Sequence, residues 1–258
     1  ETARLIRAMG FTRVTFLNRG TTQAFVADNP RWVLIAFRGT EITSFADIKT
    51  DGAICQRPAF GGRVHRGFHH GLQLVWPQLL EAVRRQGRRD HGWKPIWITG
   101  HSLGGALATL AALRLDRAAI PVRGTLTLGQ PRVVDRALAA RFPGRERIYR
   151  VTNRGDPVVH VPVPYQWRIL RGLNRACAFD YRHVGLAREF RRQRGGAWTP
   201  VTVDPRAPPP PTEKRSRLRR AGRSIGRFFR SLSSVFTVAR PMLPRYLKNL
   251  WARIPPGR

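Results

Sequence analysis

The sequence predicts an α/β fold, with a mostly parallel central sheet, helices on both faces and a basic C-terminal tail. Apolar, strand-like runs alternate with stretches of helical periodicity along residues 1–205. One strand–turn–helix, Pro95–Leu110, carries a G-x-S-x-G pattern. After residue 205 a proline run leads into an arginine-rich segment, so we place a domain boundary there, with a tail over residues 206–258.

Strands are expected near the start of the chain, at Arg13–Leu17, Thr22–Ala27 and Trp32–Phe37. The third is continuously apolar, which is typical of a central strand covered on both faces. After it we expect a short helix at Glu41–Thr50, and a loop through the glycine-rich stretch that ends at Gly62.

Helical periodicity predicts a helix over Gly67–Gln86, which Pro77 is expected to kink or split. The strand of Pro95–Leu110 and its helix come next. The remaining predicted elements alternate in type: a strand at Val122–Leu128, a helix at Val133–Arg141 and a strand at Arg147–Thr152.

The G-x-S-x-G pattern, in its strand–turn–helix context, predicts a nucleophile elbow with Ser102 at its tip. The turn brings strand and helix so close that the flanking positions cannot carry side chains, which Gly100 and Gly104 satisfy. The following helix would direct its N-terminal N–H groups at the point where negative charge develops.

A serine needs a base to take its proton, and in this arrangement the acid and then the histidine follow the serine. Two histidines lie downstream, His160 and His183. We favour His183, in a loop-like site after the last predicted sheet strand, and interpret His160 as a neighbouring loop residue.

Asp156 is the best candidate for the acid, because it follows the carboxyl end of a predicted strand. The other acids weighed sit on a helix, at a helix start, at the wrong end of a strand, or too near the histidine: Asp116, Asp135, Glu146 and Asp180. For the oxyanion hole we expect the N–H of Leu103 and the N–H and hydroxyl of Thr40.

These motifs resemble those of the class 3 lipase family, the fungal-type triacylglycerol lipases of the α/β-hydrolase fold. The matching pieces occur in family order: FRGT at Phe37–Thr40, VHRGF at Val64–Phe68, GHSLGGALA at Gly100–Ala108, LGQPRV at Leu128–Val133, NRGDPV at Asn153–Val158 and YRHVG at Tyr181–Gly185. The resemblance implies the same roles for Ser102, Asp156, His183, Thr40 and Leu103.

The resemblance also implies a lid over the site at Glu41–Arg63. The segment Tyr165–Phe179 looks like an extra loop near the site, and the basic tail is outside the family pattern. Substrate contacts are expected from both regions, at Ile42, Phe45, Tyr165 and Trp167.

The formal net charge is +32, and residues 206–258 carry fourteen Lys or Arg against one acid. Phenylalanines and aliphatic residues recur there at helical spacing, which favours a helix lying on an anionic membrane surface. An unstructured, solvated tail remains nearly as good an interpretation, and nucleic-acid binding ranks third.

The sequence thus predicts a serine hydrolase of lipid esters, most simply a triacylglycerol lipase, that needs no cofactor or metal. The alternatives are a phospholipase A1-type or non-lipid esterase and, from another class, an inactive lipid-surface binding protein. Free thiols are the default for Cys55 and Cys177, with a single pair as the alternative. We expect a cytoplasmic or peripheral membrane location and leave a signal sequence open, since the chain starts without Met; no oligomeric state is predicted.

Overall fold

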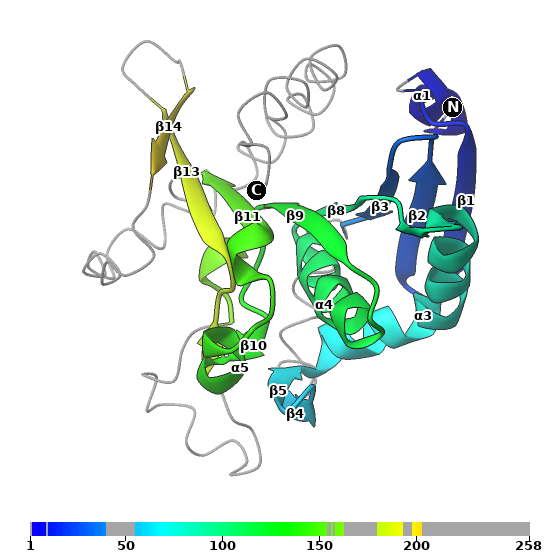
Figure 1. Cartoon of the computed structure of the whole chain (residues 1–258). Coiled ribbons are helices and arrows are strands. Elements are labelled where there is room, and N and C mark those ends of the chain that lie inside the picture. The colour runs from blue at the N-terminus through cyan, green and yellow to red at the C-terminus, as the bar shows by residue number, and fades with distance from the viewer. Residues whose placement is uncertain are drawn as a thin grey trace. The chain divides into compact units, whose positions relative to one another are not determined.

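The structure is a computed structural model that describes residues 2–8, 10–39, 55–153, 156, 158–162, 180–192 and 198–202. Its central sheet (Figure 1) has the strand order β1-β2-β3-β8-β9-β11-β13-β14. These strands are β1 (Arg13–Arg19), β2 (Thr22–Asp28), β3 (Val33–Phe37), β8 (Ile96–His101), β9 (Val122–Leu128), β11 (Ile148–Asn153), β13 (Leu186–Arg192) and β14 (Trp198–Thr202).

The five strands from β3 to β13 run parallel, and the antiparallel pairs lie at the two ends of the sheet. This confirms the predicted α/β fold with a mostly parallel sheet. Because parallel strands all end at the same edge, the residues that follow β3, β8, β9 and β11 gather there. That edge receives Ser102, after β8, and Asp156, after β11.

Two helices, α3 (Arg66–Gly87) and α4 (Leu103–Arg117), pack on one face of the sheet and against each other. α4 is buried almost along its whole length, which explains why its sequence is apolar on all sides. On the other face, Ile6 of α1 (Thr2–Ala8) packs with Phe11 and Ala27 in a smaller apolar cluster. Helices therefore cover both faces, as predicted.

A second, four-stranded sheet lies below the first in Figure 1 and has the order β12-β10-β5-β4. Its strands are β4 (Gln56–Ala59), β5 (Gly62–His65), β10 (Val134–Asp135) and β12 (Tyr181–Arg182). The remaining elements are short: β6 (Arg88–Arg89), β7 (Gly92–Trp93), α5 (Arg136–Ala140) and two 3-10 turns, η2 (Arg145–Arg147) and η3 (Val158–His160).

Three expectations about secondary structure were wrong. The stretch before Gly62 is not all loop, because β4 and β5 form a hairpin. The helix expected from Val133 begins only at Arg136, because β10 pairs with β5 and β12 instead. The sheet also continues after His183, with β13 and β14. Strands of two to four residues carry no periodic signal of their own, and partners distant in sequence decide their pairing.

Pro77 lies inside α3 without dividing it, so the expected split does not occur. Figure 1 shows α3 as a bent helix, as expected when a proline removes one hydrogen bond of the helical ladder. Cys55, just before β4, is disulfide-bonded, so the default of a free thiol was wrong for this residue. The only other cysteine of the chain is Cys177.

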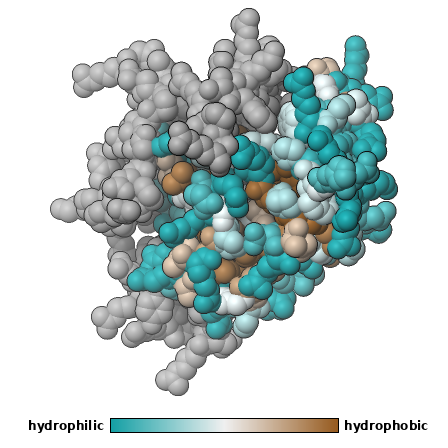
Figure 2. Space-filling view, in the orientation of Figure 1, coloured by the Kyte–Doolittle hydropathy of each residue, from teal (hydrophilic) through white to brown (hydrophobic). Residues whose placement is uncertain are grey.

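On the face shown in Figure 2 the described surface is largely hydrophilic, with an apolar area near its middle. None of the helices in the described ranges is long and apolar enough to cross a bilayer. The helix expected at Glu41–Thr50, the boundary at residue 205 and the basic tail lie outside the described residues.

Candidate active site

Ser102 occupies a strained turn between β8 and α4, with φ 54° and ψ −122°. A non-glycine residue in such a conformation costs about 1–3 kcal/mol, and strain of this kind persists where the surrounding structure enforces it. A Cβ atom at Gly100 would lie 2.2 Å from the carbonyl oxygen of Gly104, and one at Gly104 would lie 2.4 Å from that of Phe37. The predicted steric reason, the close approach of strand and helix, is therefore confirmed for Gly100. At Gly104 the crowding comes from the end of the neighbouring strand β3.

The surroundings of Ser102 suit a nucleophile. Its N–H donates to the carbonyl oxygen of Leu128 at 2.8 Å, which ties the elbow to the end of β9. The residue is 4% exposed, and its Oγ has no hydrogen-bond partner among the described residues. Leu103 is the first residue of α4, so its N–H has no acceptor within the helix. A backbone donor and the positive end of a helix dipole thus lie beside Oγ.

The loop after β3 passes against the elbow. A Cβ atom at Gly39 would lie 2.7 Å from the carbonyl oxygen of His101, the residue before the nucleophile. The next residue, Thr40, lies outside the described residues, so its role as an oxyanion donor stays a prediction. The close approach at Gly39, the residue before Thr40, nevertheless brings this loop beside the elbow.

Asp156 is buried at the same edge of the sheet, 8% exposed. Its Oδ1 accepts a hydrogen bond from the N–H of Val158 at 2.9 Å. Its Oδ2 lies 3.0 Å from the position of a Cβ atom at Gly129, and Nε2 of His101 lies 3.6 Å from that position. Burial raises the pKa of the Asp156 carboxyl, and the bond from Val158 works against that rise.

The other acids weighed in the sequence are engaged elsewhere. Asp135 caps α5 through Leu138 N–H at 2.7 Å, as its position at a helix start predicted. Asp180 forms ion pairs with arginines, and Asp116 and Glu146 are exposed. Among these acids, Asp156 therefore remains the candidate for the catalytic acid.

Nε2 of His183 lies 2.8 Å from the carbonyl oxygen of Val159. Its Nδ1 is buried and has no partner in the part of the chain that the structure describes. Burial, and after it the charges of Arg150 and Arg132, hold the pKa of His183 well below its ordinary value. The imidazole is therefore kept neutral, the form that a general base requires.

The structure thus places the serine and the acid at one edge of the sheet, but the described residues include no hydrogen bond from His183 to Ser102 or Asp156. The side chain of His160 is exposed. The assignment of acid and base remains a prediction.

Two arginines that the sequence did not single out lie near His183. Arg150, on β11, is 8% exposed, and its Nε has no hydrogen-bond partner among the described residues. Burial, followed by the charge of Arg132, lowers the pKa of Arg150 to about 10. Arg132 follows β9 and is half-buried. The burial of these two arginines could not be predicted from the local sequence, because strand and loop arginines are usually exposed.

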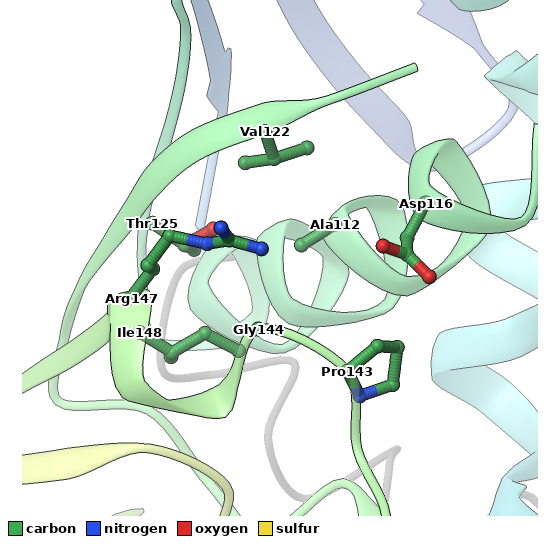
Figure 3. Close-up of a pocket in the computed structure, with 8 residues that line it drawn as sticks. All are labelled: Ala112, Asp116, Val122, Thr125, Pro143, Gly144, Arg147 and Ile148. Carbon is green, nitrogen blue, oxygen red and sulfur yellow. The ribbon is translucent and has the colours of Figure 1, made fainter. Parts of the chain in front are cut away.

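A small cavity lies at the opposite edge of the sheet, where β9 and β11 begin and α4 ends (Figure 3). Asp116 and Arg147 are the charged residues that line it. Because Ser102 lies at the other ends of these strands, this cavity is separate from the candidate active site. Within the described ranges, His, Cys, Asp and Glu form no group of three that could hold a metal ion.

The substrate-contact residues expected in the lid and the extra loop lie outside the described residues: Ile42, Phe45, Tyr165 and Trp167. Of the expected lid, the structure describes residues 55–63, which include β4 and the start of β5. The tip of this hairpin is held by Arg117, whose guanidinium donates to the carbonyl oxygen of Phe60 at 2.8 Å.

The profile of the family described as Lipase (class 3) matches residues 34–166, just over half of the chain. The chain belongs to the class 3 lipase family. The match contains Ser102 and Asp156 and ends before His183. The resemblance stated from the motifs is confirmed.

Curated relatives agree with this class 3 lipase assignment. A lipase of Rhizomucor miehei is 35% identical over 149 residues, which are 55% of this chain and 41% of that protein. A secreted mono- and diacylglycerol lipase A of Penicillium cyclopium is 27% identical, over 51% of this chain and 43% of that protein. The chain spans about two-fifths of the length of the curated relatives it matches.

Solved structures support the fold. The triacylglyceride lipase of Rhizomucor miehei superposes with a TM-score of 0.55 at 25% identity, covering 75% of this chain and 71% of that one. A mutant form of the Penicillium cyclopium enzyme gives a TM-score of 0.61 at 22% identity, over 78% of this chain and 73% of that one. The α/β-hydrolase fold of this member of the class 3 lipase family is thereby confirmed.

Proposed function

We propose that the protein hydrolyses carboxylic esters of lipids through an acyl-serine intermediate. The observation that carries the proposal is the elbow: Ser102 is held at φ 54° between two glycines, at the N-terminus of α4. Membership of a lipase family and the names of the relatives support a lipid substrate.

In the proposed reaction Ser102 Oγ attacks the ester carbonyl carbon, and His183 takes the hydroxyl proton. The N–H groups of Leu103 and Thr40 bind the oxyanion that forms. The C–O bond to the alcohol then breaks, and His183 returns its proton to the departing alcohol. Water, activated by the same imidazole, adds to the acyl-enzyme and releases the fatty acid, while Asp156 stabilises the imidazolium.

Glycerides are the proposed substrate, and phospholipids or short soluble esters are the alternatives within the same chemistry. The test is initial rates on a triglyceride, a diglyceride, a phosphatidylcholine and a short nitrophenyl ester. We expect the glycerides to be cleaved fastest, with a rate that rises more than proportionally once the substrate forms an emulsion, because a lid opens at the interface. Hyperbolic kinetics across that transition would indicate an open esterase site, and inertness on every ester would favour the lipid-binding alternative.

We further propose that the basic tail docks the enzyme on anionic membranes through its phenylalanines as well as its charge. Truncation after Asp204 should leave hydrolysis of the soluble ester unchanged and should lower co-sedimentation with anionic vesicles. Charge attraction alone is screened by salt, whereas inserted apolar side chains are not. Replacing Phe228 and Phe229 with Ser should therefore weaken vesicle binding in high salt at unchanged charge.

Equal vesicle binding by the full-length and truncated proteins would refute docking and leave a solvated tail. If duplex DNA competed fully with the vesicles for the protein, and the two phenylalanine changes had no effect, nucleic-acid binding would be the favoured role of the tail instead.

We propose an oxidising compartment for the protein, in place of the cytoplasm. Disulfides persist outside the cytosol, and Cys55 is disulfide-bonded. The relative from Penicillium cyclopium is described as secreted, which also gives the cytoplasmic expectation no support.

A further inference from the structure

Arg132 holds the turn that follows Asp156 by three consecutive carbonyl oxygens. Its backbone N–H donates to the carbonyl oxygen of Val161 at 2.8 Å. Its side-chain Nη1 donates to the carbonyl oxygens of His160 and of Pro162, the latter at 3.0 Å. Charge-assisted bonds are stronger than bonds between neutral groups, so the two bonds from the guanidinium are the stronger part of this anchor.

The same segment also reaches the candidate base. The carbonyl oxygen of Val159, one residue before the three that Arg132 binds, is the contact of His183 Nε2 at 2.8 Å. Val133, the next residue after Arg132, donates its N–H to the carbonyl oxygen of Arg182 at 3.3 Å. His183 is therefore held on its ring by Val159, the residue next to those that Arg132 binds, and on the backbone just before it by Val133, the neighbour of Arg132.

We propose that Arg132 is a positioning residue of the catalytic site, which fixes the loop carrying the base against the loop carrying the acid. The inference rests on the proposed serine-hydrolase mechanism. In this proposal Arg132 does not contact the substrate. It acts through the position of His183 relative to Asp156. Displacing a catalytic group by about 1 Å can cost on the order of 100-fold in rate.

The charge of Arg132 provides a second test of the proposal, through the pKa of His183. The groups that face His183 are Arg150 from β11, Arg132 from the segment after β9 and His160 from η3, all of which disfavour the imidazolium. Arg182 in turn lies near Arg132 and, after burial, helps to lower the pKa of Arg132 to about 10. Removing the positive charge of Arg132 should raise the pKa of His183, so the acid limb of the kcat/KM profile should move to higher pH.

Two substitutions separate geometry from charge. Arg132→Lys keeps the charge but replaces the planar fork with a single ammonium, so we expect kcat to fall about 10-fold to 100-fold with an unmoved acid limb. Arg132→Gln should give a similar loss and also shift the acid limb to higher pH. In both variants KM for a soluble short-chain ester should stay near that of the wild type.

The matched control is Arg145→Gln, since Arg145 also donates from its guanidinium to a backbone carbonyl, that of Ala140, but near the opposite edge of the sheet. It should leave kcat and the pH profile unchanged. Thermal unfolding of each variant gives the folded fraction by which kcat is corrected. If Arg132→Gln does not fold, Arg132→Lys decides the question by its kcat alone.

A corrected kcat within about twofold of wild type in the Arg132 variants, or a loss of stability with no change in kcat or pH profile, would overturn the positioning role. A wild-type protein that cleaves no ester would instead refute the proposed function. The two failures are thus distinguishable in one series of measurements.

Discussion

Ser102→Ala is expected to reduce ester hydrolysis to background, a loss of about 10⁵-fold to 10⁶-fold in kcat. In the proposed mechanism Oγ of Ser102 forms the acyl bond, so its removal leaves the reaction without its nucleophile. The measurement is hydrolysis of a short-chain nitrophenyl ester, with circular dichroism to show that the variant folds. A phosphonate probe should label the wild type at Ser102 alone.

Ser102→Gly is the companion variant, because the elbow imposes φ 54° on this residue. Both variants should be inactive, but glycine adopts this conformation without steric strain. The free energy of unfolding of the glycine variant should therefore be about 1 kcal/mol higher than that of the alanine variant, after allowance for the greater backbone entropy of glycine in the unfolded chain. Residual activity in either variant, or phosphonate labelling at another residue, would contradict the assignment of the nucleophile.

His183→Ala and Asp156→Asn are expected to lower kcat by about 10³-fold to 10⁴-fold each, while His160→Ala should lower it much less. A base must take the proton of Ser102, and an acid must hold the imidazole tautomer and stabilise its charged form. His160 is the matched control, because it lies near His183 with an exposed side chain and binds Arg132 through its backbone carbonyl, which the substitution retains. The measurement is kcat on the same soluble ester, with folding checked for each variant.

An effect of His160→Ala as large as that of His183→Ala would show that His183 is not the base. Non-additivity provides a second test. If His183 and Ser102 act as one unit, the double variant should lose no more activity than Ser102→Ala alone. Additive losses would mean that the two residues act separately.

The arrangement in the described residues also has a mechanistic consequence. Nε2 of His183 contacts the carbonyl oxygen of Val159 instead of Ser102 Oγ. For the proposed reaction the imidazole must exchange this partner for the serine hydroxyl. Catalytic hydrogen bonds are often long or poorly aligned without substrate and tighten when it binds. The turn at residues 158–162, which Arg132 holds, is therefore the part of the site where small displacements affect the base most directly.

Much of this protein could be predicted from its sequence, because the decisive signals are local. Continuous apolar runs predicted the central strands, and helical periodicity predicted α3 with a kink or a split at Pro77, of which the split does not occur. The elbow was predictable for a steric reason: strand and helix approach so closely that only glycine fits at Gly100. The need for glycine at Gly104 comes in addition from the neighbouring strand β3. Family membership followed from six short motifs in a fixed order.

Only the tertiary structure decided the contacts between segments that are far apart in the chain. The two-residue strand β10 pairs with both β5 and β12, and its local sequence has no periodicity that could predict this pairing. Arg150 is buried because its strand lies inside the sheet, although arginine by itself predicts exposure. Arg132 binds carbonyl oxygens 28 and 30 residues away, which are brought to it only when the carboxyl ends of parallel strands meet at one edge. The sequence by itself predicted the longer elements and the elbow that carries Ser102, since these depend on neighbouring residues, whereas folding of the whole sheet decided which groups surround His183.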